Sequence, residues 1–191
     1  MIIATPPDDS SDPGVARLYA EDLADSGLIF AHTRAMAVNP EAYAAFEQLV
    51  RTLVPSVGPR IYEIATLAAA RAVGSPHCVL AHTRRAIEIG ALTPDEAEGL
   101  GDALSPAERE VVRFAERLSL RPTDMDDDDT ARLRAAGYSD RQIVDIALIA
   151  GARNHFSRAL QALAVPVDEV PRLDPALADR LLSRLPEASA R

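Results

Sequence analysis

Signals for the start of a helix recur along this chain and constrain its fold more than any other feature. Each places a hydroxyl residue three positions before Glu or Gln, so that the two side chains can cap the first backbone N–H groups of a helix. The clearest are Thr93–Glu96, Ser105–Glu108 and Ser139–Gln142, and the first two carry proline directly after the hydroxyl residue. Proline suits the first helical position because its missing N–H would have no partner there. No long alternating pattern typical of strands is present, and we therefore predict an all-α protein.

Length and composition agree with helices packed in one bundle. The chain has 191 residues, enough for one domain with a core of useful size. Hydrophobic residues make up 48% of it, yet only 4% are aromatic and tryptophan is absent. Alanine dominates the apolar residues, and alanine favours helices that pack closely. We expect a single-domain helical bundle.

The charged residues narrow the choice of partners. The formal net charge of −9 argues against a nucleic acid or an anionic membrane surface as a partner. The chain has no lysine, which excludes Schiff-base chemistry and lysine-bound pyridoxal phosphate. We expect no cofactor and no bound metal.

The sequence indicates neither export nor membrane insertion. The only cysteine, Cys78, cannot form an internal disulfide. The first residues are acidic and interrupted by proline, unlike a signal peptide. The longest apolar run, residues 143–152, is interrupted by Asp145 and is too short to span a bilayer. We expect a soluble, cytoplasmic protein.

Three parts are expected along the chain: a flexible N-terminal arm over residues 1–13, a helical domain over 14–165 and a C-terminal tail over 166–191. Apolar residues at helical spacing mark the elements. The expected helices cover residues 15–26, 33–37, 40–53, 60–73, 76–89, 94–100, 106–118, 130–136, 140–164 and 175–185. The proline-flanked segment 55–59 is expected to be a linker, and the helix over 140–164 to be central.

A run of four acids, Asp126–Asp129, precedes one of these helices. It could suggest a cation site, but the spaced ligands of a calcium loop are missing. Acids at a helix start are favoured by the helix dipole, and we interpret the run in that way.

The segment from Glu63 to Gly90 holds the only cysteine and two of the four histidines. Gly74, Ser75 and Pro76 form a tight break between two helices, with Ser75 at the cap. Cys78 is then the third residue of the second helix, where free N–H groups and the dipole favour thiolate over thiol. His82 lies four residues on, on the same face, as a base beside an activated thiol would.

A simpler interpretation remains open for this cysteine. Free cysteine is often buried as a small apolar residue, and Cys78 could merely fill the start of a packed helix. A similar choice applies to the polar residues within the expected central helix, which are Arg153, Asn154, His155, Ser157 and Arg158. They form either a structural hydrogen-bond network or one wall of a pocket.

The spacing of Glu63, Ser75, Cys78 and His82 resembles a motif of the alkylhydroperoxidase D-like and carboxymuconolactone decarboxylase superfamily. That motif is Glu, a spacer and then Cys-x-x-Cys-x-x-x-His, and the peroxidase-related branch is the most similar. The similarity extends over residues 15–165, including the segments that begin LSPAEREVV and LRAAGYSDRQ. The resemblance implies an all-helical fold, a homo-oligomer (a trimer or hexamer) and a thiol redox site.

The resemblance also assigns roles to residues. Cys78 matches the cysteine that attacks peroxide, His82 the histidine that takes its proton, and Glu63 the carboxylate that orients the histidine. Ser75 stands where the family has its second cysteine, so an internal dithiol cycle cannot run in this chain. We expect Ser75, His77 and His155 to line the site.

Four functions stay open at this point. The first is a one-cysteine, antioxidant peroxidase that reduces a hydroperoxide through Cys78 and is restored by an external thiol reductant. The second is a lactone decarboxylase-like enzyme in which His82 and Glu63 act as acid and base on a small acidic lactone. The third is a redox-inactive or sensing homologue. The fourth is a metal site formed by Cys78, His82 and Glu63.

Overall fold

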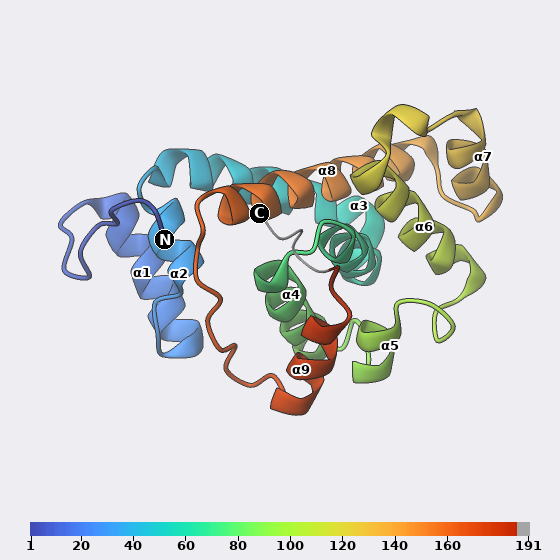
Figure 1. The fold of residues 1–191 in the computed structure, drawn as a ribbon. Helices are drawn as coiled ribbons and strands as arrows, with labels where there is room; N and C mark the ends of the chain where they lie inside the picture. Colours follow the sequence, from blue (N-terminus) through green and yellow to red (C-terminus); the bar gives the residue numbers. More distant parts are fainter. Residues whose placement is uncertain (187–191) are drawn as a thin grey trace.

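The computed structural model describes residues 1–186, and these residues form helices without any β-strand. The fold class predicted from the capping signals is therefore confirmed. The helices are α1 (Pro13–Ser26), α2 (Ala31–Met36), α3 (Pro40–Ala72), α4 (Pro76–Glu88), α5 (Pro94–Gly99), α6 (Pro106–Leu120), α7 (Asp127–Ala135), α8 (Asp140–Ala162) and α9 (Pro175–Ser183), with a short 3-10 turn at Pro122–Asp124 (Figure 1). None of the helices in this part of the chain is long and apolar enough to cross a membrane.

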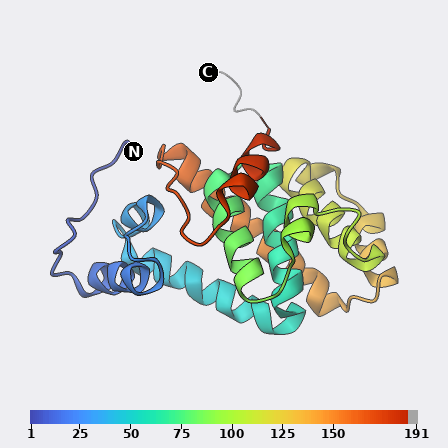
Figure 2. The same ribbon diagram turned by 90° about the horizontal axis from the view of Figure 1, so that it is seen from below.

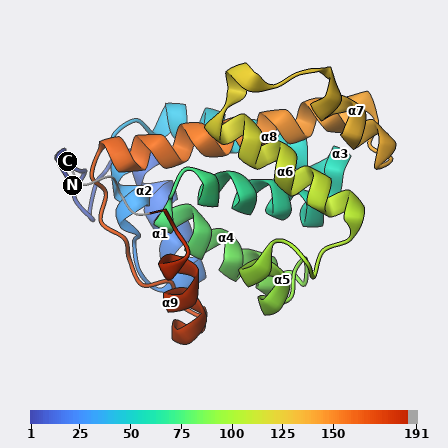
Figure 3. The same ribbon diagram turned by 45° about the vertical axis from the view of Figure 1, so that its right-hand side comes forward.

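The second half of α3 is the centre of the bundle. Its residues from Ile64 to Ala70 have no measurable exposure, and α8, α6 and α4 all pack against it. Figure 3 shows α8 and α6 on one side of this segment and α4 on the other. The short side chains of Ala65, Ala68, Ala69 and Ala70 allow the neighbouring helices to approach closely.

The break expected over residues 55–59 is present as a kink without a separate linker, and two helical halves of α3 meet there at an angle (Figure 2). The kink is confined to Gly58, whose φ of 79° and ψ of 160° are not helical. Pro59 directly follows, and a residue before proline is disfavoured in the helical region. Glycine adopts this positive φ without steric cost, so one residue is enough to redirect the helix.

The predicted capping boxes are present at Thr93, Ser105 and Ser139, each with its Glu or Gln partner. The acidic run also forms a box, in which Asp126 and Asp129 cap each other's backbone. Asp129 is buried and pairs with Arg113 at 2.9 Å and Arg117 at 3.2 Å. The run is thus accounted for as a helix start.

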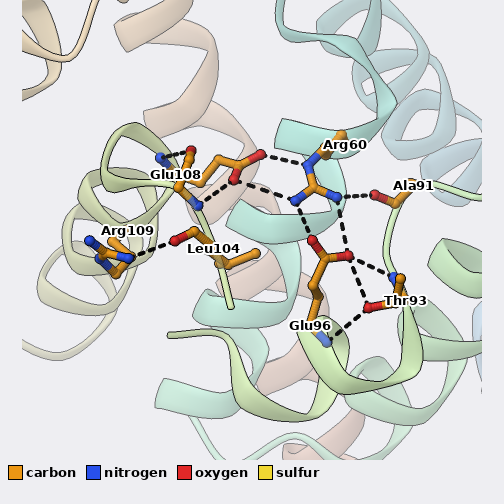
Figure 4. A network of polar contacts seen from close by, with 8 residues as sticks. Arg60, Ala91, Thr93, Glu96, Leu104, Glu108 and Arg109 are labelled. Atoms are coloured by element: carbon orange, nitrogen blue, oxygen red, sulfur yellow. Dashed lines mark hydrogen bonds and ion pairs between the residues drawn. The ribbon is translucent and has the colours of Figure 1, made fainter. Parts of the chain in front are cut away.

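Arg60 joins two of these boxes to the central helix (Figure 4). Its guanidinium donates to Glu96 at 2.7 Å, to Glu108 at 2.5 Å and to the Ala91 carbonyl at 2.7 Å. Both carboxylates also cap their own helices, so one cation fixes α3 against the starts of α5 and α6. Its hydrogen bonds lower the pKa of Glu96 to about 2.

Segments near both ends of the described residues pack on the bundle. Near the N-terminus, the Ile2 amide donates to the Leu163 carbonyl at 3.1 Å. In the tail, Leu177 and Leu181 of α9 are buried in the cluster that contains Cys78, and α9 contacts α4 and α5 of the same chain. The homo-oligomer stays a prediction. Val144 and Leu148 of α8 are 56% and 45% exposed and would suit such a contact.

Arg60→Gln should lower the free energy of unfolding by about 1–2 kcal/mol at pH 7, since it removes charge-assisted hydrogen bonds from a partly exposed site. The lowered pKa of Glu96 means that this stabilisation is present above its ordinary pKa of 4.5 and is lost as the pH falls towards 2. Urea denaturation of both proteins between pH 7 and pH 3 should show the two curves converging. Arg121→Gln, at an exposed arginine, is the control, and an undiminished difference at low pH would contradict the role of Arg60.

Candidate active site

Cys78 lies at the wall of a cavity of about 560 Å³ between α3, α4 and α8. It is the third residue of α4, as expected, and only 2% of its surface is exposed. Its sulfur accepts hydrogen bonds from the Ser157 hydroxyl at 3.2 Å and from Arg153 Nη1 at 3.4 Å. Both donors come from α8, one turn apart.

The helix start before Cys78 differs from the expected cap. Ser75 occupies the cap position and Pro76 follows, but the Ser75 hydroxyl accepts no hydrogen bond from α4. Cys78 stands where a capping box would place Glu, and its side chain turns to α8 instead. The backbone N–H groups of the first turn therefore lack a side-chain cap, and Cys78 lies within this positive end of the helix dipole.

Arg153 is a buried cation without a carboxylate partner in the described part of the chain. It is 6% exposed, and its Nε has no hydrogen-bond partner. Burial by itself would lower the pKa of Arg153, but its interactions with Cys78 and Tyr62 outweigh burial and raise that pKa. A buried guanidinium is costly without a partner, and the Cys78 sulfur is the partner of its Nη1.

His82 and Glu63 form a second unit on the same cavity. His82 Nδ1 donates to Glu63 Oε2 at 2.7 Å, and Arg85 Nε donates to the other carboxylate oxygen at 3.1 Å. Glu63 has no measurable exposure, so these two partners fix the carboxylate and the ring. With Nδ1 donating, Nε2 of the neutral ring is the acceptor.

The protonation of His82 follows from its surroundings. Burial and the positive charge of Arg153 lower its pKa, and the Glu63 carboxylate opposes them only in part. His82 is therefore neutral at pH 7 and able to take up a proton. No hydrogen bond joins His82 to Cys78, although both line the cavity.

The other expected lining residues lie in different places. His77 lines the cavity, and its Nε2 donates to the Pro166 carbonyl at 2.8 Å. Ser75 is fully buried behind the lining, and its hydroxyl has no partner. His155 is exposed and packs on Phe46, with ring centroids 6.1 Å apart, and it is not among the cavity residues.

The polar segment of α8 forms part of the cavity wall and also contributes to a structural hydrogen-bond network. Arg153 and Ser157 contact Cys78, whereas Arg158 donates to the Ser119 carbonyl at 3.1 Å and is structural. Sequence reasoning placed this segment at a pocket wall only as one option and did not connect it to the thiol. The available signal was the four-residue spacing of Arg153 and Ser157 on an otherwise apolar face.

The arrangement does not resemble a metal centre. The Glu63 carboxylate is occupied by His82 and Arg85, and the Cys78 sulfur by donors from α8. Within residues 1–186 no three His, Cys, Asp or Glu side chains lie together as ligands would.

Glu63→Gln should lower the pKa of His82 further, because the amide removes a negative charge that favours the imidazolium. The exposed side chain of Arg85 remains solvated in this variant, so the fold should persist. Nuclear magnetic resonance titration of the four histidine rings measures the change, with His82→Gln identifying the signal. An unchanged or raised pKa in Glu63→Gln would contradict the pairing.

Comparison with known proteins finds a family model that matches part of the chain and solved structures with a similar fold. Residues 40–117 match the model of the Carboxymuconolactone decarboxylase family, and no curated protein matches the chain. An uncharacterized peroxidase-related protein from Ralstonia eutropha JMP134, an alkylhydroperoxidase AhpD core, has a similar structure with a TM-score of 0.77, 18% identity and 97% of each chain covered.

Two further solved structures are similar. One is an uncharacterized peroxidase-related protein from Silicibacter sp. TM1040, with a TM-score of 0.74, 21% identity, and 85% of this chain and 89% of that chain covered. The other is the debrominase Bmp8 in complex with 2,3,4-tribromopyrrole, with a TM-score of 0.75, 19% identity, and coverage of 94% and 97%. Residues 40–117 thus match the Carboxymuconolactone decarboxylase family model, and the chain as a whole shares its fold with these solved structures.

Proposed function

We propose that this protein is a one-cysteine peroxidase that reduces a hydroperoxide through Cys78. The observation that supports it most is the contact between the Arg153 guanidinium and Cys78, the only thiol of the chain. This guanidinium is buried and has no carboxylate partner in residues 1–186. The Arg153 cation and the uncapped start of α4 both favour thiolate over thiol. The thiolate is the nucleophilic form of cysteine, and it faces a cavity that can admit a small organic molecule.

His82 moves the proton in this proposal. The neutral ring takes the thiol proton at Nε2, and the resulting imidazolium is stabilised by Glu63. The thiolate then attacks the terminal oxygen of the hydroperoxide, so that the S–O bond forms as the O–O bond breaks. The leaving alkoxide takes the proton from His82 and departs as an alcohol, and Cys78 remains as sulfenic acid.

The return step requires thiols from outside the chain. Ser75 occupies the position of the family's second cysteine and cannot form a disulfide. A first external thiol condenses with the sulfenic acid to a mixed disulfide and releases water. A second thiol then displaces Cys78 as thiol and leaves as an external disulfide, which completes the two-electron reduction.

A second function is favoured by the orientation of His82. Its hydrogen bond to Glu63 would also suit an acid and base acting on a lactone, without any role for the thiol. The relatives named above include peroxidase-related proteins and a debrominase, so the fold accommodates more than one reaction.

Replacement of Cys78 separates the two functions. Cys78→Ser should abolish hydroperoxide turnover, because the hydroxyl is not a comparable nucleophile, and should leave the helical circular dichroism unchanged. His82→Ala should lower kcat/KM by about a hundredfold or more, the usual contribution of a positioned acid or base. Peroxide consumption with excess dithiothreitol measures both, with His155→Ala as the control for a histidine outside the cavity. Full turnover by Cys78→Ser would refute the peroxidase proposal and favour chemistry at His82.

A further inference from the structure

The aromatic residues of this chain are concentrated at one place. The sequence has four phenylalanines and four tyrosines, and four of these eight side chains line the Cys78 cavity. They are Tyr43, Phe46, Tyr62 and Phe156. Cores of this protein elsewhere are made mainly of aliphatic side chains, so the concentration is a property of the cavity and not of the whole interior.

Three of the rings have nearly parallel planes. Tyr43 and Phe46 differ by 10°, Phe46 and Phe156 by 15°, and Tyr43 and Phe156 by 20°. Their centroids lie between 5.1 and 6.3 Å apart. Aromatic rings pair favourably in offset-stacked and edge-to-face arrangements at such distances. A fourth ring, from a bound molecule, could therefore pack parallel to these three rings or against their edges.

The aromatic part of the wall is uncharged at neutral pH. Burial raises the pKa of Tyr43 and Tyr62, so both phenols keep their protons. Burial also lowers the pKa of His32, which lies edge-on to Phe156, to about 4. Arg153 lies 5.7 Å from the centre of the Phe156 ring and contacts Cys78 with Nη1. The cation therefore marks the junction between the aromatic wall and the reactive sulfur.

We propose that the cavity binds substrates whose body is a planar aromatic ring, with the reacting group directed to Cys78. Hydrogen peroxide would leave most of the cavity of about 560 Å³ empty, whereas pockets of this size hold organic molecules with several carbon atoms. This inference deepens the proposed peroxidase function, and it names aryl-substituted hydroperoxides as the substrate class of the same site.

Binding can be tested without turnover. In Cys78→Ser, isothermal titration calorimetry should show 2-phenyl-2-propanol, the alcohol left by cumene hydroperoxide, binding tighter than 2-cyclohexyl-2-propanol. The two alcohols are similar in size and differ in the planar ring, so bulk burial cannot produce the difference. The expected preference for the phenyl alcohol is roughly two- to tenfold in Kd, the range for one aromatic pair. The double variant with Phe46→Leu should lose this preference. Adding Phe114→Leu, a buried aromatic outside the cavity, should leave it in place.

The rate of hydroperoxide reduction gives a second test of the aromatic site. The wild-type protein should show a higher kcat/KM for cumene hydroperoxide than for tert-butyl hydroperoxide, and Phe46→Leu should reduce this ratio while Phe114→Leu does not. Equal or tighter binding of the cyclohexyl alcohol would overturn the aromatic site, even if hydroperoxides are reduced. Selective binding of the phenyl alcohol by a protein that reduces no hydroperoxide would support the aromatic site and overturn the peroxidase function, so the two failures are distinguishable.

Discussion

The contact between the Arg153 guanidinium and the Cys78 sulfur is the interaction on which the site depends. A buried cation is costly unless an anion accompanies it, and no carboxylate does so within residues 1–186. If the sulfur were a neutral thiol, the protein would hold an uncompensated charge in its interior. In the proposed function a thiolate at Cys78 would satisfy the cation, and the same negative charge would make the sulfur a nucleophile. The sulfur also accepts a hydrogen bond from the Ser157 hydroxyl, so two donors from α8 meet it.

The fold brings the two units of the proposed site, Cys78 with Arg153 and His82 with Glu63, to one cavity through the second half of α3. This segment carries Glu63, packs α4 on one side and α8 on the other, and is fixed by Arg60 at its start. The bend at Gly58 directs the first half of α3 along α8, which brings Tyr43 and Phe46 to the cavity. One glycine thus separates a core-forming half of the helix from a half that lines the site.

Local signals in the sequence were enough for the fold class, for most of the helices and for the capped helix starts. Capping boxes and proline positions are short-range features, so Thr93, Ser105 and Ser139 could be assigned without a structure. The bend at Gly58 could not, because prolines before and after a glycine are equally typical of a linker. The contact of Arg153 with Cys78 spans 75 positions of sequence and depends on how α8 packs, which no periodicity reveals. His155 lies two residues from Arg153 but is exposed and not in the cavity, and this too depends on how α8 packs.

The central claim, that Arg153 holds Cys78 as a reactive thiolate, is tested most directly by trapping its oxidation product. Wild-type protein, Arg153→Lys and Arg153→Met would each receive one equivalent of cumene hydroperoxide with a nucleophile selective for sulfenic acid, followed by mass spectrometry of the Cys78 peptide. The account predicts a trapped adduct in the wild type, partial retention with lysine, and a loss of about tenfold or more with methionine, which fills space without charge. Equal trapping in Arg153→Met with intact helical circular dichroism, or no adduct in the wild type, would contradict it.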